Sequence, residues 1–107
     1  MTTGRKKLES TKFTALDSTA WITVTAVPAS TDVVVITDMI VSSDTSASKC
    51  QFRQTDGTTN ELIMVFNTAN DRNEIANFSQ PIHLKEGYYL QCSASANSFC
   101  TVNHYQI

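Results

Sequence analysis

Turns and polar loops divide this chain into short runs, and no run shows the 3.6-residue period of a helix over ten residues. These breaks lie at residues 17–18, 28–32, 43–48, 56–57, 67–73, 85–87 and 96–98. Between them, apolar and polar residues alternate with the period of two that half-buried strands show. The sequence therefore predicts an all-β domain of about eight strands. The expected strands are residues 12–16, 20–27, 33–43, 49–55, 61–67, one within 74–84, 88–95 and 99–107.

Two further patterns select the architecture. Residues 33–36 (Val-Val-Val-Ile) are apolar on both faces of a strand, which indicates a central position in a sheet. Ser and Thr make up 26 of the 107 residues, and Thr with the β-branched aliphatics favours a pleated sheet. About eight antiparallel strands in one domain of this size fit a jelly-roll-like β-sandwich. An immunoglobulin-like sandwich is the alternative, although Trp21 does not lie between two suitably spaced cysteines.

The same alternation predicts local detail. In the strand 20–27, Trp21 shares one face with Thr23 and Thr25, and the apolar residues between them take the other. Pro81 cannot donate a hydrogen bond to a neighbouring strand, so it marks a sheet edge or a bend. Residues 88–95 and 99–107 are expected to pair as a final hairpin.

Charge is distributed unevenly along the chain. Residues 1–12 carry Arg5, Lys6, Lys7 and Lys12 against one glutamate, a net charge of +3, and we assign them to a basic N-terminal arm. Residues 13–107, the single β domain, have a net charge of −5. This acidic body argues against a nucleic-acid groove on the domain. The arm fits either contact with an acidic partner or a solvated terminus.

The three cysteines are Cys50, Cys92 and Cys100, an odd number. The expected final hairpin would place Cys92 and Cys100 opposite each other, either as a disulfide or as two small buried apolar side chains. The N-terminus has no apolar segment of a secretory signal, and no stretch is apolar enough to cross a membrane. We therefore expect cytoplasmic synthesis and buried thiols.

No pattern of catalytic or cofactor-binding residues stands out, and we expect neither an enzyme nor a cofactor. His83 and His104 are isolated, and no nucleophile elbow or zinc spacing accompanies them. Residues 67–74 are rich in oxygen ligands, which fits either a calcium site or a solvated loop. With three glycines in the chain, loops that cradle phosphates are not expected.

The order of features from residue 13 to residue 107 resembles small jelly-roll structural proteins of tailed bacteriophages, in particular capsid decoration (cement) proteins. The resemblance lies in Trp21-Ile-Thr-Val-Thr followed by Val27-Pro-Ala, then the long strand 33–43. It continues in the spacing from Leu84 through Gly87 to Leu90. Many relatives have a glycine before the long strand, where this chain has Ser30-Thr-Asp32.

This resemblance implies a virion protein, assembled in the host cytoplasm, that binds the outer surface of a phage head and stabilises it. It implies a homo-oligomer, often a trimer, whose partner is the major capsid protein. An N-terminal arm commonly ties such proteins to the shell. The residues that would make this contact here are Arg5, Lys6, Lys7, Leu8 and Phe13.

Two other functions remain open from the residues. One is a carbohydrate- or receptor-binding module of a phage fibre or tail, which would present an exposed aromatic platform, for example from Tyr88, Tyr89 and Tyr105. The other is a β-sandwich hydrolase, which would need a pocket that joins His83 or His104 to a carboxylate.

Overall fold

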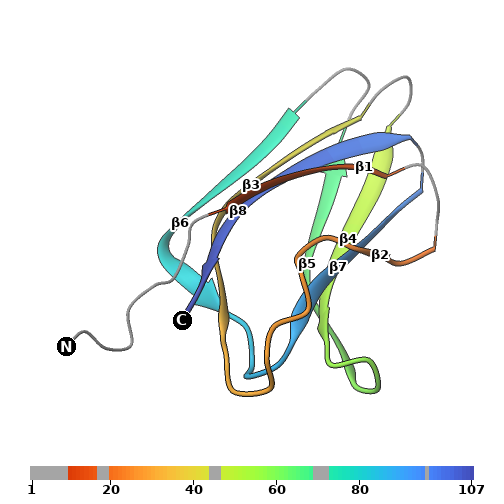
Figure 1. Cartoon of the computed structure of the whole chain (residues 1–107). Coiled ribbons are helices and arrows are strands. Elements are labelled where there is room, and N and C mark those ends of the chain that lie inside the picture. The colour runs from red at the N-terminus through yellow and green to blue at the C-terminus, as the bar shows by residue number, and fades with distance from the viewer. Residues whose placement is uncertain (1–9, 17–19, 44–46, 69–72, 96) are drawn as a thin grey trace.

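Two four-stranded antiparallel sheets face each other in the computed structural model, which describes residues 10–16, 20–43, 47–68, 73–95 and 97–107 (Figure 1). Sheet A has the strand order β1-β8-β3-β6 and sheet B has the order β2-β7-β4-β5. The described residues include no helix that could span a membrane. The strands are β1 Ser10–Leu16, β2 Ile22–Thr23, β3 Val34–Ser43, β4 Ser48–Thr55, β5 Asn60–Thr68, β6 Asn73–His83, β7 Tyr89–Ala94 and β8 Ser98–Gln106.

The chain changes sheet between consecutive described strands, except from β4 to β5, which form a hairpin. This order is that of a jelly roll, in which two four-stranded sheets interleave as Greek keys. The predicted all-β, eight-stranded jelly-roll-like sandwich is therefore confirmed. Because the two sheets face each other, each strand presents one face to the interior of the sandwich.

The expected final hairpin is wrong. Strand β7 lies in sheet B beside β4, whereas β8 lies in sheet A between β1 and β3. Both strands alternate apolar and polar residues. That alternation is the same whether two successive strands pair side by side or face each other across a core, so the sequence pattern does not separate the two arrangements.

The strand expected at residues 20–27 is also much shorter than predicted. After β2, the backbone N–H groups of Val24 and Thr25 both donate to the carbonyl of Leu90, over 2.8 and 3.4 Å. Two residues sharing one acceptor break the alternation, and both Val24 and Thr25 are buried, although the period of two placed them on opposite faces. The Thr25 hydroxyl accepts a hydrogen bond from the Leu90 N–H.

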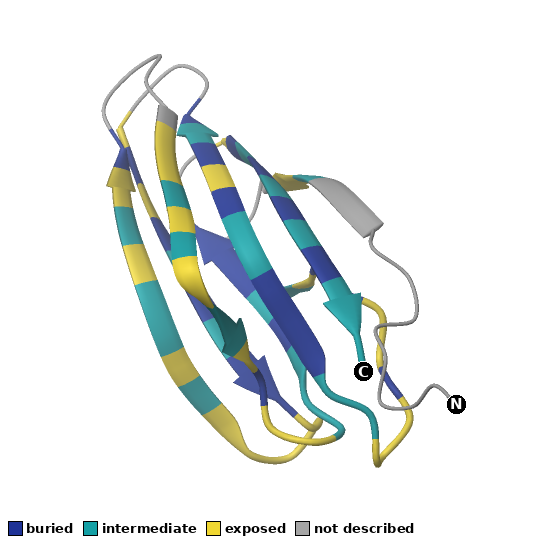
Figure 2. Cartoon of the chain, turned by 90° about the vertical axis from the view of Figure 1, so that its left-hand side faces the viewer, coloured by how far each residue is buried: buried dark blue, intermediate teal, exposed yellow. Residues whose placement is uncertain are grey.

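Strand β3 lies at the centre of sheet A, between β8 and β6, as its apolar run predicts. Val34, Val35 and Ile36 are all fully buried, which confirms that the strand is covered on both faces. Figure 2 shows the contrast with the edge strands β5 and β6, along which exposed and half-buried positions prevail. The inward side chains of both sheets form the core, which consists of Val24, Val34, Ile36, Met39, Val41, Cys50, Phe52, Leu84, Leu90, Cys92, Ala94, Cys100 and Val102.

Strand β6 is the edge of sheet A and bends strongly (Figure 1). Its pairing with β3 jumps from Ile36 opposite Ile82 to Asp38 opposite Asn77, so the irregular stretch of β6 is longer than the part of β3 that it faces. Pro81 lies within this irregular stretch. Its predicted position at an edge or a bend is confirmed, because Pro lacks the N–H that regular pairing requires.

Two glycines with positive φ offer a matched test of the packing between loops. A Cβ added at Gly57 (φ 98°) would make only an ordinary contact with the Tyr89 hydroxyl, at 3.8 Å. A Cβ at Gly87 (φ 77°) would lie 3.3 Å from the Ser30 carbonyl oxygen. We expect Gly57→Ala to cost about 1 kcal/mol through backbone strain alone. Gly87→Ala should cost about 1 kcal/mol more, because the loop that holds Ser30 must also shift.

Thermal unfolding of both variants measures this difference. At this chain length each kcal/mol corresponds to a decrease in Tm of about 4–8 °C. Equal Tm values for the two variants would show that the loop around Ser30 does not constrain Gly87.

Candidate binding surfaces

Of the five residues predicted to contact a capsid, the structure describes Phe13. Arg5, Lys6, Lys7 and Leu8 lie outside the described residues. Phe13 lies in β1, where its backbone is opposite Thr101 of β8. Because β1 begins at Ser10, the last three residues of the segment 1–12 belong to a strand of sheet A.

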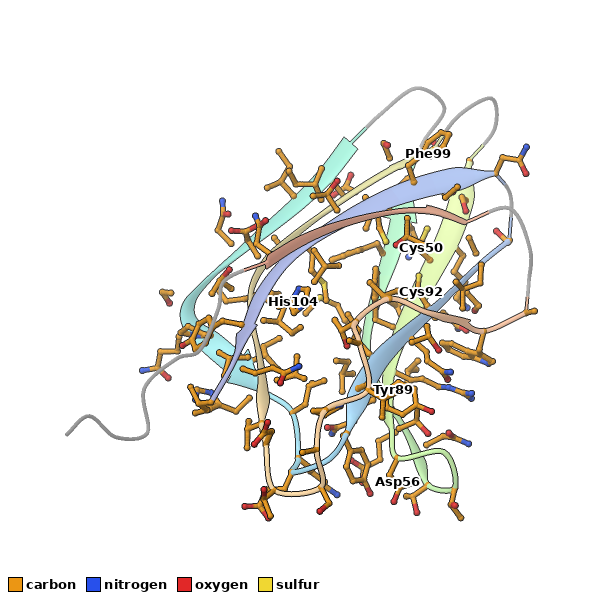
Figure 3. All side chains as sticks on the ribbon, viewed as in Figure 1. Cys50, Asp56, Tyr89, Cys92, Phe99 and His104 are labelled. Atoms are coloured by element: carbon orange, nitrogen blue, oxygen red, sulfur yellow. The ribbon has the colours of Figure 1, made fainter. Side chains whose placement is uncertain are left out.

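The cysteines meet across the core. Cys92 enters from sheet B and Cys100 from sheet A, and their side chains share a hydrogen bond. Figure 3 shows Cys50 and Cys92 between the two sheets. All three cysteines are buried free thiols, as expected, although Cys92 and Cys100 approach from facing sheets rather than from neighbouring strands. The hydrogen bond with Cys100, together with burial, raises the pKa of the Cys92 thiol above its usual range.

The two histidines do not converge. His83 is opposite Val35 and His104 is opposite Ile36, two successive residues of β3 whose side chains point to opposite faces of sheet A. His83 is exposed, and its Nδ1 lies 3.3 Å from the Pro81 carbonyl oxygen. His104 is buried on the inner face (Figure 3). The sequence spacing of the two histidines does not predict that their side chains lie on opposite faces of sheet A.

Half of the segment considered for calcium, residues 69–72 of 67–74, lies outside the described residues. Asn67 and Thr68 end β5, and Asn73 begins β6. Among the residues that the structure describes, no three His, Cys, Asp or Glu side chains come together in a way that could hold a metal ion.

Strand β5 exposes apolar side chains along the edge of sheet B. Its pairing with β4 shifts between Phe52 opposite Met64 and Arg53 opposite Leu62, which leaves Ile63 as an extra residue. Ile63 and Met64 both pack against the core as a result, whereas Leu62 and Val65 point outward with 58% and 39% of their surface exposed. The sequence predicted this apolar strand but not its edge position.

A second exposed apolar pair lies on the outer face of sheet A. Ile40 of β3 is directly opposite Ile75 of β6, and both side chains are exposed, Ile75 by 61%. Cross-strand apolar pairs at an edge expose a small hydrophobic area that a protein partner can cover. The irregularity between Ile36 and Asp38 shifts the alternation of β3, so Met39 and Val41 face the core and Ile40 faces outward.

The outer face of sheet B carries a hollow. The register of β2 and β7 puts Trp21 level with Ser93, and Ser93 is opposite Gln51 of β4. One step along, Ser95 lies beside Lys49, whose N–H donates to the Ser95 hydroxyl over 2.8 Å. The hollow has a volume of about 250 Å³. It is lined by Trp21, Lys49, Gln51, Ser93, Ala94 and Ser95.

The aromatic wall of this hollow is held in place by a chain of polar contacts across three strands. The Arg53 guanidinium lies over the Trp21 ring, 4.2 Å from its centroid. The Arg53 Nε–H donates to Gln91 Oε1 over 2.9 Å, and the Gln91 amide donates to the Thr23 hydroxyl over 3.2 Å. Each tie limits the rotamers of its neighbour, so the indole has a fixed orientation.

The tyrosines that the alternative of a binding module would use as an aromatic platform are half-buried. Tyr88 packs against the core, and the Lys85 ammonium lies 5.6 Å from the centroid of its ring. Tyr89 and Tyr105 lie in β7 and β8. The aromatic residue at the hollow is therefore Trp21, which alternation had placed correctly on one face with Thr23.

The turn between β4 and β5 sets the position of the exposed edge strand. The Asp56 carboxylate accepts hydrogen bonds from the N–H groups of Thr58 and Thr59, over 2.8 and 2.7 Å (Figure 3). These bonds, that of Thr59 first, hold the pKa of Asp56 below its usual value, because they favour the charged form. Gly57 supplies the positive φ that the turn requires.

Comparisons with known proteins support the fold and do not identify a family. No family model matches the chain, and no curated protein is similar to it in sequence. Among solved structures, the chain is similar to one from work on Bacillus endospore appendages, described as a novel family of disulfide-linked pili. The TM-score is 0.54 at 12% identity, over 98% of this chain and 93% of that one. At this identity, the likeness shows a shared fold.

Burial of the thiols predicts low reactivity. At pH 8 we expect iodoacetamide to modify the cysteines of the native protein at least about a hundredfold more slowly than those of the urea-unfolded protein, because the core must open first. Intact-mass spectrometry counts the modified thiols. A Thr58→Cys variant, with one added thiol in the exposed turn, should gain one modification quickly. Rapid native modification of Cys92 would contradict the inter-sheet packing.

The Asp56 turn predicts a pH-dependent contribution to stability. Since the folded-state pKa is lowered, the carboxylate stabilises the fold above its unfolded-state pKa, and this contribution is lost as the pH falls through the folded-state value. Asp56→Asn should therefore be less stable than the wild type at pH 7, with a difference that shrinks below about pH 4. Urea unfolding of Asp56→Asn and the wild type at pH 7 and below about pH 4 measures this difference in stability. Glu86→Gln, in a different exposed turn, serves as the control, and an equal effect there would rule out a specific role for Asp56.

Proposed function

We propose that this chain is a structural virion protein that binds the outer surface of a phage head and stabilises it. The observation that carries the proposal is the apolar edge strand β5, nine residues long, with Leu62 and Val65 exposed. Soluble monomers avoid long apolar edge strands, because unpaired strands invite association. An edge of this kind is therefore suited to be covered, either by a neighbouring copy or by the shell.

Charge supports the same role. The arm has a net charge of +3 and the remaining chain −5, so the molecule can attach through its N-terminus to an acidic surface that its body would avoid. The proposed contact residues are Arg5, Lys6, Lys7, Leu8 and Phe13. Their partner would be the major capsid protein, and no turnover is involved.

Self-association would strengthen such binding. In the proposed trimer, three arms engage the shell together, so weak individual contacts combine into high overall affinity. The apolar residues of β5 and the Ile40–Ile75 pair offer surfaces for contact between copies.

Assembly into disulfide-linked pili, which is described for the endospore appendage protein with this fold, is the alternative role. Links between copies through disulfides do not suit this chain, because all three of its cysteines are buried. The capsid role needs no exposed thiol, and we therefore prefer it.

Co-sedimentation with mature and immature heads of the source virus tests the proposal. We expect the wild-type protein to bind heads, and deletion of residues 1–9 to weaken binding by about tenfold or more, which corresponds to about 1.4 kcal/mol. The deletion stops before β1, which begins at Ser10, so sheet A keeps its edge strand. The arm contribution should decrease with added salt.

Two further variants separate the surfaces. A double substitution of Leu62 and Val65 by Glu should reduce self-association, which sedimentation equilibrium measures. Lys85→Gln, which also removes a positive charge but lies on the body, is the control for the arm and should leave head binding unchanged. If the wild-type protein binds neither form of head, the proposed function is wrong.

A further inference from the structure

The hollow on the outer face of sheet B arises from a difference in side-chain size between neighbouring strands. On β7 and just beyond it, the outward positions are Ser93 and Ser95, two small side chains. The residues beside them, Trp21 on one side and Lys49 and Gln51 on the other, are long. A row of small residues between two rows of large ones leaves a depression, and its floor is fixed by the pairing of β7 with β4.

The chemistry of the lining is that of a site for a small polar ligand. Its walls combine one indole ring with an amide, two hydroxyls and an ammonium group. A pyranose has the complementary surfaces: a face of C–H groups that packs on the electron-rich face of an aromatic ring, and hydroxyls that exchange hydrogen bonds with amides and serines. A volume of about 250 Å³ suits a single sugar residue better than a larger ligand.

The orientation of Trp21 is set before any ligand arrives. The Arg53 guanidinium occupies one face of the indole, 4.2 Å from the ring centroid, and the contacts through Gln91 to Thr23 hold that arginine. A ring that is already ordered loses little rotamer entropy on binding, which favours affinity for a small ligand. A lone exposed tryptophan on a loop would lack this advantage.

The charge of the residues that line the hollow favours an anionic ligand. Lys49 is the charged residue of the lining, and no carboxylate takes part in it among the residues that the structure describes. An anionic group on the ligand would therefore meet a cation without an opposing acid in the hollow. The net charge of −5 outside the arm disfavours extended polyanions such as nucleic acids.

We propose that this hollow binds a sugar residue that carries a carboxylate, with Trp21 packing on the ring and Lys49 facing the acid group. The site does not rest on the proposed binding to phage heads. It gives the domain a second binding surface, for acidic glycans, on the outer face of sheet B and separate from the arm.

Saturation-transfer NMR with three probes tests this inference: N-acetylneuraminic acid, methyl glucuronide and the neutral methyl glucoside. We expect transfer to the acidic sugars with a Kd in the millimolar range and weaker transfer to the glucoside. Trp21→Ala should weaken binding by about tenfold or more, because it removes the packing surface. Lys49→Gln should weaken binding of the acidic sugars by several-fold and leave the glucoside unchanged.

Matched controls keep the test independent of folding. Val27→Ser replaces an exposed apolar side chain that lies outside the hollow and outside the proposed apolar surfaces, and it should bind the sugars like the wild type. Unfolding alone would also make Trp21→Ala lose binding, so a second variant is needed that retains Trp21. Ser93→Gln places a longer side chain in the hollow, and it should abolish binding. No transfer from any of the three probes to the wild-type protein, or equal transfer to the wild type and Ser93→Gln, would overturn the proposal. Co-sedimentation of Trp21→Ala with heads reports on the other function separately.

Discussion

Everything in this domain depends on burying one face of each sheet against the other. The largest fully buried side chains come from both sheets, including Phe52 and Leu90 of sheet B and Ile36 and Met39 of sheet A. Each buried side chain of this size contributes about 1.5–3 kcal/mol relative to exposure, so a handful of them outweighs the net stability of a typical domain. The inward side chains fix the register of the central strands. The register in turn determines which side chains lie next to one another on the outer faces of the sheets. The surfaces that we assign to binding are thus a consequence of the core.

Irregular strand pairing determines which apolar side chains of the edge strand β5 face the core and which are exposed. An ideal β5 would alternate strictly, and its five apolar residues from Leu62 to Phe66 would be divided between the two faces. The extra residue Ile63 lets two successive side chains reach the core, and Leu62 and Val65 are left outside it. Bulges of this kind are common at sheet edges, where they redirect side chains and locally interrupt the hydrogen bonds of the ladder. In β6 a longer irregularity around Pro81 bends the opposite edge.

The sequence predicted most of the strands and many of their faces, but it predicted neither the neighbours of each strand nor the irregular backbone that buries both Val24 and Thr25. The apolar run at residues 33–36 correctly predicted a central strand, and alternation correctly separated Trp21 from Ile22, because both signals are local. Cys92 and Cys100 illustrate the limit: alternation placed both on an apolar face, yet whether two successive strands pair or face each other depends on contacts far along the chain. The hollow was out of reach for the same reason. Its concavity depends on Ser93 lying between Trp21 and Gln51, which come from three separate parts of the chain.

The opposing charges of the arm and the body constrain how the two proposed functions can coexist. Copies that gather on a shell bring acidic bodies close together, and at physiological ionic strength their repulsion reaches about 8 Å. Contacts between copies must therefore come from surfaces that gain by losing water, and the exposed residues of β5 and the Ile40–Ile75 pair are of that kind. The hollow differs in character, since its lining is polar and includes Lys49. A polar hollow gains little from contact with another acidic copy, so a copy would pack on the apolar residues of β5 beside it, where Val65 is opposite Gln51 of the lining.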